Sequence, residues 1–310
     1  MMNIVITEFM DDGAVEDLRK SFDVVYDPNL VEQPDRLAEL AKRAEALIVR
    51  NRTQVRGPLL EDAGALKCVG RLGVGLDNID CEACADKGIT VFPATGANDD
   101  AVAEYVITSV LMLLRGAYAA SSEVAAGTWP RQHLIGREVG GKTLGLIGFG
   151  SIARETARRA QILGMDVITF DPYISGQSEI WAQTGVENLP LDAVLERSDA
   201  ISLHVPLTED TRHIINRDAL RKMRPTSVLI NAARGGVVDE EALVAALKAG
   251  ELAGAALDVF ENEPLSAEAG QKFSGLTNVF LTPHIAGVTK ESNVRVSHLI
   301  AKLVSEHLQS

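Results

Sequence analysis

The sequence is short of basic residues relative to acidic ones. Among its 310 residues, Lys and Arg number 30 against 43 Asp and Glu, so the formal net charge is −13. A protein whose main partner is a nucleic-acid backbone or an anionic membrane needs a basic face, so we expect neither partner. Any anionic ligand must therefore be bound by local arginines.

Cysteine is also scarce. Cys68, Cys81 and Cys84 are too few for a disulfide scaffold. Cys81 and Cys84 have the CxxC spacing, but no second pair completes a zinc site. We therefore expect ordinary reduced thiols and no bound metal.

Long hydrophobic runs are absent, as is an N-terminal leader. The most apolar stretch, "AVAEYVITSVLMLL" from Ala101, carries Glu104 and is too short to span a bilayer. We expect a cytoplasmic protein without membrane contact. Apolar residues surround nearly the whole of this predicted helix, so it requires cover on more than one side, which predicts a homodimer.

Short apolar runs alternate with helical periodicity along the chain. The runs are "NIVIT" near residue 3, "ALIVR" from Ala46, "ITVF" from Ile89, "TLGLI" from Thr143, "DVITF" from Asp166, "AISLH" from Ala200, "SVLIN" from Ser227 and "VFLTP" from Val279. This alternation predicts βαβ units and an α/β fold with parallel sheets. A chain of this length with 46% hydrophobic residues exceeds one ordinary domain. We expect two, with the chain changing domain near the long helix candidate that starts close to Asp99.

The stretch "LGLIGFGSIARETARR", residues 144–159, places two glycines between a strand and a helix. Gly148 permits a tight turn, and Gly150 has no Cβ to block phosphates that approach the amides at the helix N-terminus. Ala153 occupies the third position of the pattern, which needs only a small residue for packing between helix and strand. The glycine pattern alone is a weak signal, because a plain strand-to-helix turn explains it too.

The next strand, "DVITFDP", ends in Asp171, about 20 residues further on. A carboxylate there would bond both adenosine ribose hydroxyls and repel a 2′-phosphate. This predicts NAD rather than NADP as the cofactor, whereas the alternative is that Asp171 only starts a turn before Pro172.

Polar residues follow several later strands, at the edge where a doubly wound sheet binds ligands. "HVPLTEDT" from His204 and "NAARGG" from Asn231 can line the nicotinamide side of the cofactor. "LDVFENEP" supplies Asp258, Glu261 and Glu263, and "LTPHIAG" supplies His284. A carboxylate and a histidine are what a proton-transfer pair requires. Taken singly each is an ordinary residue, so the hypothesis depends on their joint placement.

Seven ordered motifs give the sequence a resemblance to the D-isomer-specific 2-hydroxyacid dehydrogenases, particularly the phosphoglycerate dehydrogenase branch. They are "RLGVGLDNID" from Arg71, "AVAEYVI", "LGLIGFGSIA", "HVPLTEDT", "NAARGGVVDEEAL", "ALDVFENEP" and "TPHIAGVT". The resemblance implies two Rossmann-like doubly wound domains. A nucleotide-binding domain, residues 99–285, is inserted into a discontinuous substrate domain, residues 1–98 and 286–310.

The resemblance also implies roles for individual residues. Arg234 would bind the substrate carboxylate and polarise its carbonyl, because a guanidinium fork suits that task. His284 would exchange a proton with the substrate oxygen, and Glu263 would hold His284 protonated. The 73–75 loop would offer its backbone amides to the substrate carboxylate; these residues are Gly73, Val74 and Gly75.

The implied NAD site is a larger set, in which Asp171 meets the adenosine end and Asp258 the nicotinamide end. Its members are Gly148, Phe149, Gly150, Ser151, Ile152, Asp171, His204, Pro206, Thr211, Ala232, Asp258 and His284.

The segment "VRNRT" bears on the substrate. It places Arg50 and Arg52 at the end of an early strand, on one side by the two-residue period, where phosphoglycerate dehydrogenases carry phosphate-binding arginines. The alternative is that both are solvated surface charges. The chain ends at residue 310, so we expect no regulatory domain and no serine feedback.

A doubly anionic substrate fits this arginine pair, and the sequence slightly favours 3-phosphoglycerate. (S)-Sulfolactate is the close alternative, because its sulfonate changes the naming priority so that the (S) form has the D-type arrangement. Another 2-hydroxyacid dehydrogenase or glyoxylate reductase activity stays open. So does an NAD-sensing corepressor that binds without turnover, since fold does not fix function.

Overall fold

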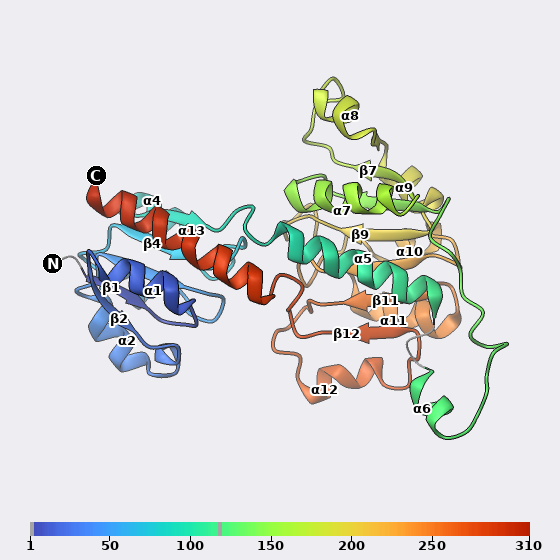
Figure 1. The fold of residues 1–310 in the computed structure, drawn as a ribbon, viewed down its shortest axis with the longest axis horizontal. Coiled ribbons are helices and arrows are strands. Elements are labelled where there is room, and N and C mark those ends of the chain that lie inside the picture. The colour runs from blue at the N-terminus through green and yellow to red at the C-terminus, as the bar shows by residue number, and fades with distance from the viewer. Residues whose placement is uncertain (1–2, 117–119) are drawn as a thin grey trace. The chain divides into compact units, whose positions relative to one another are not determined.

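The structure is a computed structural model that describes residues 3–116 and 120–310. Its chain divides into two compact units (Figure 1). Unit 1 comprises the described residues up to Asn98 together with Val288–Ser310, and unit 2 comprises the described residues of Asp99–Gly287. Each unit is built on one parallel sheet, which confirms the α/β class and the Rossmann-like architecture.

Unit 1 has a five-stranded sheet in the order β2-β1-β3-β4-β5. The strands are β1 (Asn3–Ile6), β2 (Asp23–Tyr26), β3 (Ala46–Val49), β4 (Cys68–Arg71) and β5 (Thr90–Pro93). The helices are α1 (Asp12–Arg19), α2 (Pro34–Ala41), α3 (Pro58–Glu61), α4 (Cys81–Asp86) and α13 (Lys290–Gln309), with a 3₁₀ turn at Leu30–Glu32. The strand order reverses between β1 and β3, so the loops after these two strands diverge at the edge where such sheets bind ligands.

The C-terminal helix α13 packs directly on β4. A Cβ built on Gly70 would lie 2.5 Å from Cγ2 of Ile300, so only a glycine in the strand lets the helix approach this closely. The helix begins with a capping box in which Thr289 and Ser292 each bond the other's backbone amide. The end of the chain is thereby part of the unit 1 core.

Unit 2 has a seven-stranded sheet in the order β12-β11-β10-β9-β6-β7-β8. The strands are β6 (Thr143–Ile147), β7 (Asp166–Phe170), β8 (Glu187–Asn188), β9 (Ala200–Leu203), β10 (Val228–Asn231), β11 (Gly254–Leu257) and β12 (Val279–Leu281). The helices are α5 (Asp99–Arg115), α6 (Ser121–Ala125), α7 (Ser151–Ile162), α8 (Glu179–Thr184), α9 (Leu191–Arg197), α10 (Arg217–Lys222), α11 (Glu240–Ala249) and α12 (Ala267–Gly270), with a 3₁₀ turn at Gln271–Phe273. The order reverses between β6 and β9, which makes the carboxyl ends of these strands the ligand-binding edge.

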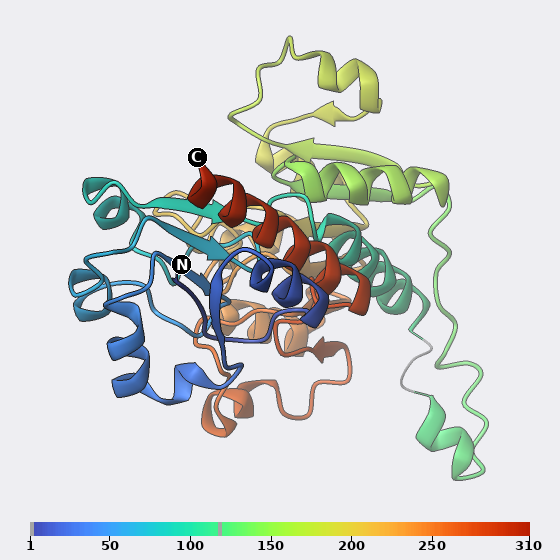
Figure 2. The same cartoon turned by 60° about the vertical axis from the view of Figure 1, so that its left-hand side comes forward.

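Two apolar clusters sandwich the unit 2 sheet. One contains buried residues of α10 and α11, and the other contains those of α5 and α7. Helices α5 and α7 run side by side along one face of the sheet (Figure 1). The segment that includes α6 leads away from the sheet and buries none of the α6 side chains (Figure 2).

All eight apolar runs expected to form strands do so, but four further strands escaped the pattern. Strand β11, "GAAL", is fully buried yet carries no β-branched or aromatic residue. Gly254 fits there because a Cβ would lie 2.8 Å from the Asn278 carbonyl. Such a strand forms because it packs closely against its neighbours, and the β-propensity of its residues does not predict that packing. The others missed are β2, β4 and β8.

Among residues 3–116 and 120–310, no helix is both long enough and apolar enough to cross a membrane.

Candidate active site

The turn from β6 into α7 has the geometry of a pyrophosphate cradle. Gly148 has φ of 90°, and a Cβ there would lie 2.6 Å from the His204 carbonyl oxygen. Gly150 is the N-cap of α7, makes no side-chain cap and faces open space. The first amide that bonds back is that of Arg154, so the amides before it in the helix lack intrahelical acceptors. These amides fit the pyrophosphate of a dinucleotide.

Two further residues of this turn are buried in the core of unit 2. Ala153 is fully buried under the sheet, as the third position of the pattern requires. The ring of Phe149 is also fully buried and stacks on Trp181 with 5.3 Å between centroids.

Asp171, half-buried after β7, is tied to the glycine turn. Its carboxylate accepts hydrogen bonds from the Phe149 amide at 2.8 Å, the Tyr173 amide at 2.9 Å and the Ile174 amide at 3.2 Å. Asp171 therefore does start a turn, and the same bonds fix its carboxylate beside the cradle. Its contact with a ribose stays a prediction.

The loops after β9 and β10 carry the remaining predicted cofactor residues. Burial lowers the pKa of His204 to about 4, so the ring is neutral near pH 7, and its Nε2 lies 3.0 Å from Ser202 Oγ. Thr211 Oγ1 donates to the Pro206 carbonyl at 2.6 Å. Asn231 shapes the segment that contains Ala232, because its side chain bonds the Arg234 carbonyl at 2.9 Å.

His284 and Glu263 form a close pair in unit 2. Nδ1 of His284 lies 2.7 Å from Oε2 of Glu263, and Oε1 of Glu263 accepts the Phe260 amide at 3.0 Å. Burial alone would raise the pKa of Glu263. The hydrogen bonds from His284 and Phe260 and the charge of Arg234 outweigh burial and hold this pKa below its ordinary value. Glu263 is therefore an ionised partner for the imidazole.

The Arg234 loop packs backbone against backbone on the loop that leads to Glu263. A Cβ on Gly235 would lie 1.7 Å from the Phe260 carbonyl oxygen, so no other residue fits at this position. This contact is why Arg234 and Glu263, distant in sequence, act on each other electrostatically. The predicted trio of Arg234, Glu263 and His284 thus comes from loops of one unit.

Asp258 lies inside unit 2 and binds backbone amides. Its carboxylate is fully buried and accepts the amides of Ile285 at 2.8 Å and Ala286 at 2.7 Å. Its proposed contact with nicotinamide stays a prediction, while the structure shows it holding the loop that carries His284.

In unit 1 the 50–53 loop departs from the geometry expected for it. Strand β3 ends at Val49, so Arg50 and Arg52 lie in the loop and the two-residue strand period does not apply to them. The loop is folded around the buried carboxylate of Glu8, which accepts the amides of Arg50 at 2.9 Å, Arg52 at 3.1 Å and Thr53 at 3.0 Å.

Both arginine side chains of this loop have partners within unit 1. Arg50 bonds Asn293 of α13, and its guanidinium carbon lies 5.5 Å from the Phe9 ring centroid. Burial lowers the pKa of Arg50 and the charge of Glu8 opposes this, but an arginine stays cationic. Arg52 pairs with Glu32 at 3.0 Å, and both of these side chains are exposed.

The glycine loop after β4 is only partly available as a set of donors. The amide of Gly73 already donates to the Arg71 carbonyl at 2.7 Å. Only the amides of Val74 and Gly75 therefore remain as candidates for binding the substrate carboxylate. Asn78 joins this loop to the arginine loop, because its side-chain amide donates to the carbonyls of Arg50 at 3.1 Å and Thr53 at 2.7 Å.

Sequence reasoning missed Glu8, Asn78 and Gly235, among others. Glu8 follows β1 at the carboxyl edge of its sheet, so the rule that singled out His204 could have found it. Gly235 lies within the quoted motif "NAARGG", but only the packing of two loops reveals why it is a glycine.

Comparison with known proteins agrees with this geometry. Residues 107–286 match the family described as "D-isomer specific 2-hydroxyacid dehydrogenase, NAD binding domain". An (S)-sulfolactate dehydrogenase of Chromohalobacter salexigens is 53% identical over 96% of this chain and 95% of that protein. A D-3-phosphoglycerate dehydrogenase of Archaeoglobus fulgidus is 38% identical over 97% of this chain, which spans only 56% of that protein.

A solved structure extends the likeness to the whole fold. D-Lactate dehydrogenase from Aquifex aeolicus, in complex with NAD and lactic acid, superimposes with a TM-score of 0.86 at 29% identity, covering 99% of this chain and 95% of that one. The chain belongs to the D-isomer-specific 2-hydroxyacid dehydrogenase family, and it is an NAD-dependent oxidoreductase of small 2-hydroxy and 2-oxo acids.

Proposed function

We propose that this enzyme oxidises (S)-sulfolactate to its 2-oxo acid, sulfopyruvate. The observation that carries the proposal is the 53% identity to an (S)-sulfolactate dehydrogenase along nearly the full length of both chains. The sequence by itself favoured 3-phosphoglycerate, which becomes the second candidate. The phosphoglycerate dehydrogenase from Archaeoglobus fulgidus is less similar and much longer than this chain.

The charges around the 50–53 loop also favour a sulfonate over a phosphate. Arg50 and Arg52 bring two positive charges, but Glu8 lies beneath the loop and Glu32 pairs with Arg52. The local formal charge is therefore close to zero. A sulfonate carries one negative charge at every assay pH, whereas a phosphate monoester carries about −1.5 to −2 at pH 7. The smaller charge suits this loop better.

Each unit has a proposed task. Unit 2 would bind NAD at the cradle formed by Gly148, Gly150 and the start of α7, and NAD when bound accepts the hydride from the alcohol carbon. Unit 1 would be the substrate domain. Its 50–53 loop would bind the sulfonate, and the amides of Val74 and Gly75 would bind the carboxylate.

The orientation of His284 assigns its proton chemistry to one atom. Nδ1 faces Glu263, so Nε2 is the nitrogen that remains for the substrate. When Nδ1 carries the proton donated to Glu263, Nε2 holds a lone pair and takes the hydroxyl proton of the 2-hydroxy acid. In the reductive direction Nε2 returns that proton to the oxygen. Arg234 would bind the carboxylate and stabilise charge on the reacting oxygen.

The first prediction concerns His284. We expect His284→Ala to lower kcat by about 10²–10⁴-fold, because general acid–base catalysis is lost. NAD binding should persist, and quenching of Trp181, which stacks on the cofactor turn, measures it in a Trp129→Phe background.

A second histidine supplies the matched control. His213 also has positive φ and pairs with a glutamate, its Nε2 lying 3.2 Å from Glu261, but it was not predicted as a site residue. His213→Ala should keep wild-type turnover. If instead His284→Ala keeps it, the assignment of the acid–base residue is wrong.

The second prediction is the substrate. In steady-state assays with NAD, kcat/KM for (S)-sulfolactate should exceed that for 3-phosphoglycerate, D-lactate, glycerate and 2-hydroxyglutarate by at least about tenfold, because a site built for one polar group discriminates against substrates that lack or replace it. The (R) enantiomer serves as the stereochemical control and should be inert. Preference for 3-phosphoglycerate would favour the second candidate, and preference for a monoanionic acid would exclude both.

The third prediction tests the arginine loop. Arg52→Ala should lower kcat/KM for (S)-sulfolactate, which corresponds to a loss of about 1.5–3 kcal/mol of transition-state stabilisation, the scale of a hydrogen bond to a charged group. The change should have little effect on kcat/KM for D-lactate or glycerate. Glu32→Gln, which removes the partner of Arg52, should raise relative activity toward 3-phosphoglycerate. Equal impairment of all substrates by Arg52→Ala would show that the loop does not select the distal anion.

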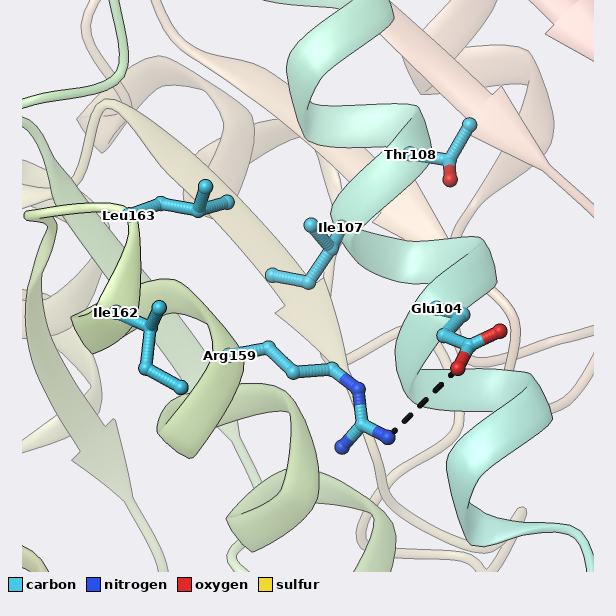
Figure 3. A pocket seen from close by; sticks show the side chains of 6 residues that line it. All are labelled: Glu104, Ile107, Thr108, Arg159, Ile162 and Leu163. Atoms are coloured by element: carbon cyan, nitrogen blue, oxygen red, sulfur yellow. Dashed lines mark ion pairs between the residues drawn. The ribbon is translucent and has the colours of Figure 1, made fainter.

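We further propose that two copies of the chain form a homodimer through unit 2. A cavity of about 370 Å³ lies between α5 and α7 (Figure 3). It is lined by Glu104, Ile107, Thr108, Arg159, Ile162 and Leu163, none of which belongs to the predicted site. Ile162 is 73% exposed, and Trp129 and Ile135 are each 75% exposed. Ile162 belongs to α7, and Trp129 and Ile135 lie in the stretch that follows α6. Large apolar side chains left in water are typical of a surface that a second copy covers.

The fourth prediction follows from that surface. Light scattering at micromolar concentration should report a dimer for the wild type. Ile135→Asp should shift the population toward monomer, because burying an unpaired carboxylate in an interface is costly. Lys248→Asp is the control, a charge change on α11, whose buried apolar residues belong to the other apolar cluster of unit 2. A monomeric wild type would contradict the proposed homodimer.

A further inference from the structure

A chain of hydrogen bonds in unit 2 runs from helix α5 to the loop that carries His284. The hydroxyl of Tyr105 lies 2.6 Å from Thr282 Oγ1, and Thr282 Oγ1 lies 2.6 Å from Asp258 Oδ1. Asp258 is fully buried, and Tyr105 and Thr282 are half-buried. Three side chains from separate parts of the sequence are therefore joined where water has little access.

The direction of each hydrogen bond follows from chemistry. The Thr282 hydroxyl donates to Oδ1 of Asp258. The Thr282 oxygen then has only acceptor capacity left, so Tyr105 must donate to Thr282. Burial raises the pKa of Tyr105, which keeps its hydroxyl protonated and able to donate. The chain has a single consistent arrangement of protons.

Asp258 also binds the backbone around His284. Its carboxylate accepts the amides of Ile285 and Ala286, and its carbonyl accepts the amide of His284 at 2.7 Å. His284 itself has φ of 55°, a left-handed conformation that is costly for a residue with a side chain. Such a conformation persists only where surrounding contacts determine it. Asp258 supplies three of these contacts, beside the Thr282 carbonyl at 3.1 Å and the Glu263 carboxylate.

We infer that Thr282 and Tyr105 are positioning residues for His284. By fixing the Asp258 carboxylate, they hold the 282–286 loop in the one conformation that directs the imidazole to Glu263 and leaves Nε2 toward the substrate. Neither residue touches the reacting atoms. The inference rests on the proposed role of His284 as the acid–base residue.

The test removes each hydroxyl in turn and measures kcat, KM and NAD affinity with (S)-sulfolactate, or with whichever 2-hydroxy acid the wild type oxidises best. Thr282→Val keeps the shape of the side chain and should lower kcat about tenfold, the value of one charge-assisted hydrogen bond. Tyr105→Phe removes a neutral donor and should lower kcat about threefold. KM for NAD and the quenching of Trp181 by NAD should stay at wild-type values.

Rescue and a matched control separate positioning from general stability. Thr282→Ser restores the hydroxyl and should restore kcat. Ser198→Ala removes a buried hydroxyl elsewhere in unit 2, one that donates to the Val194 carbonyl at 2.6 Å, and should leave kcat unchanged. Thermal unfolding of each variant shows whether it is folded.

Three outcomes overturn the inference. They are wild-type kcat in Thr282→Val, failure of Thr282→Ser to restore activity, and a loss of NAD affinity equal to the loss of kcat. Wild-type kcat in Tyr105→Phe would show that Tyr105 does not help to position His284. Failure of the proposed function looks different, because His284→Ala would then keep its turnover while the wild type remained active.

Discussion

Buried carboxylates that accept backbone amides hold the candidate site loops in both units. Asp258 binds the amides of Ile285 and Ala286 in unit 2, and Glu8 binds those of Arg50, Arg52 and Thr53 in unit 1. Loops at the carboxyl edge of a parallel sheet have no neighbouring strand to satisfy their amides. An internal anion meets that need, because bonds to a charged acceptor are stronger than neutral ones in a poorly solvated place.

Two glycines allow the site loops of unit 2 to pack closely against each other. Gly148 lets the cofactor turn lie against the His204 carbonyl, and Gly235 lets the Arg234 loop lie against the Phe260 carbonyl. In each case a Cβ would overlap backbone of the neighbouring loop, which cannot move aside as a side chain can. Loops from different strands are thereby kept close enough for charges such as those of Arg234 and Glu263 to act on each other.

The electrostatics of the chain are those of an acidic protein that handles acidic ligands. With a net charge of −13, the molecule offers no general attraction to an anion. Binding must therefore come from local donors, and the candidates are the amides that start α7, the amides of Val74 and Gly75, and the guanidinium groups of Arg50, Arg52 and Arg234. At the 50–53 loop, Glu8 and Glu32 balance the two arginines, which argues for a distal group of modest charge.

The sequence by itself determined the α/β class, the cofactor and the enzyme family. The class follows from the periodicity of the apolar runs. The cofactor follows from a strand, a glycine turn and a carboxylate at the end of the next strand, and the family from a resemblance carried by seven ordered motifs. The pairing of His284 with Glu263 is implied by the family resemblance, because spacing along the sequence does not show that the two residues touch.

Only the tertiary structure decided how those residues are held. The strand "GAAL", the carboxylate of Glu8 within the 50–53 loop, the occupied amide of Gly73 and the bonds from Tyr105 through Thr282 to Asp258 all escaped the sequence. Each depends on atoms far apart along the chain that meet only after folding. Side-chain type and spacing along the sequence carry no information about such distances, because packing between separate strands and helices sets them.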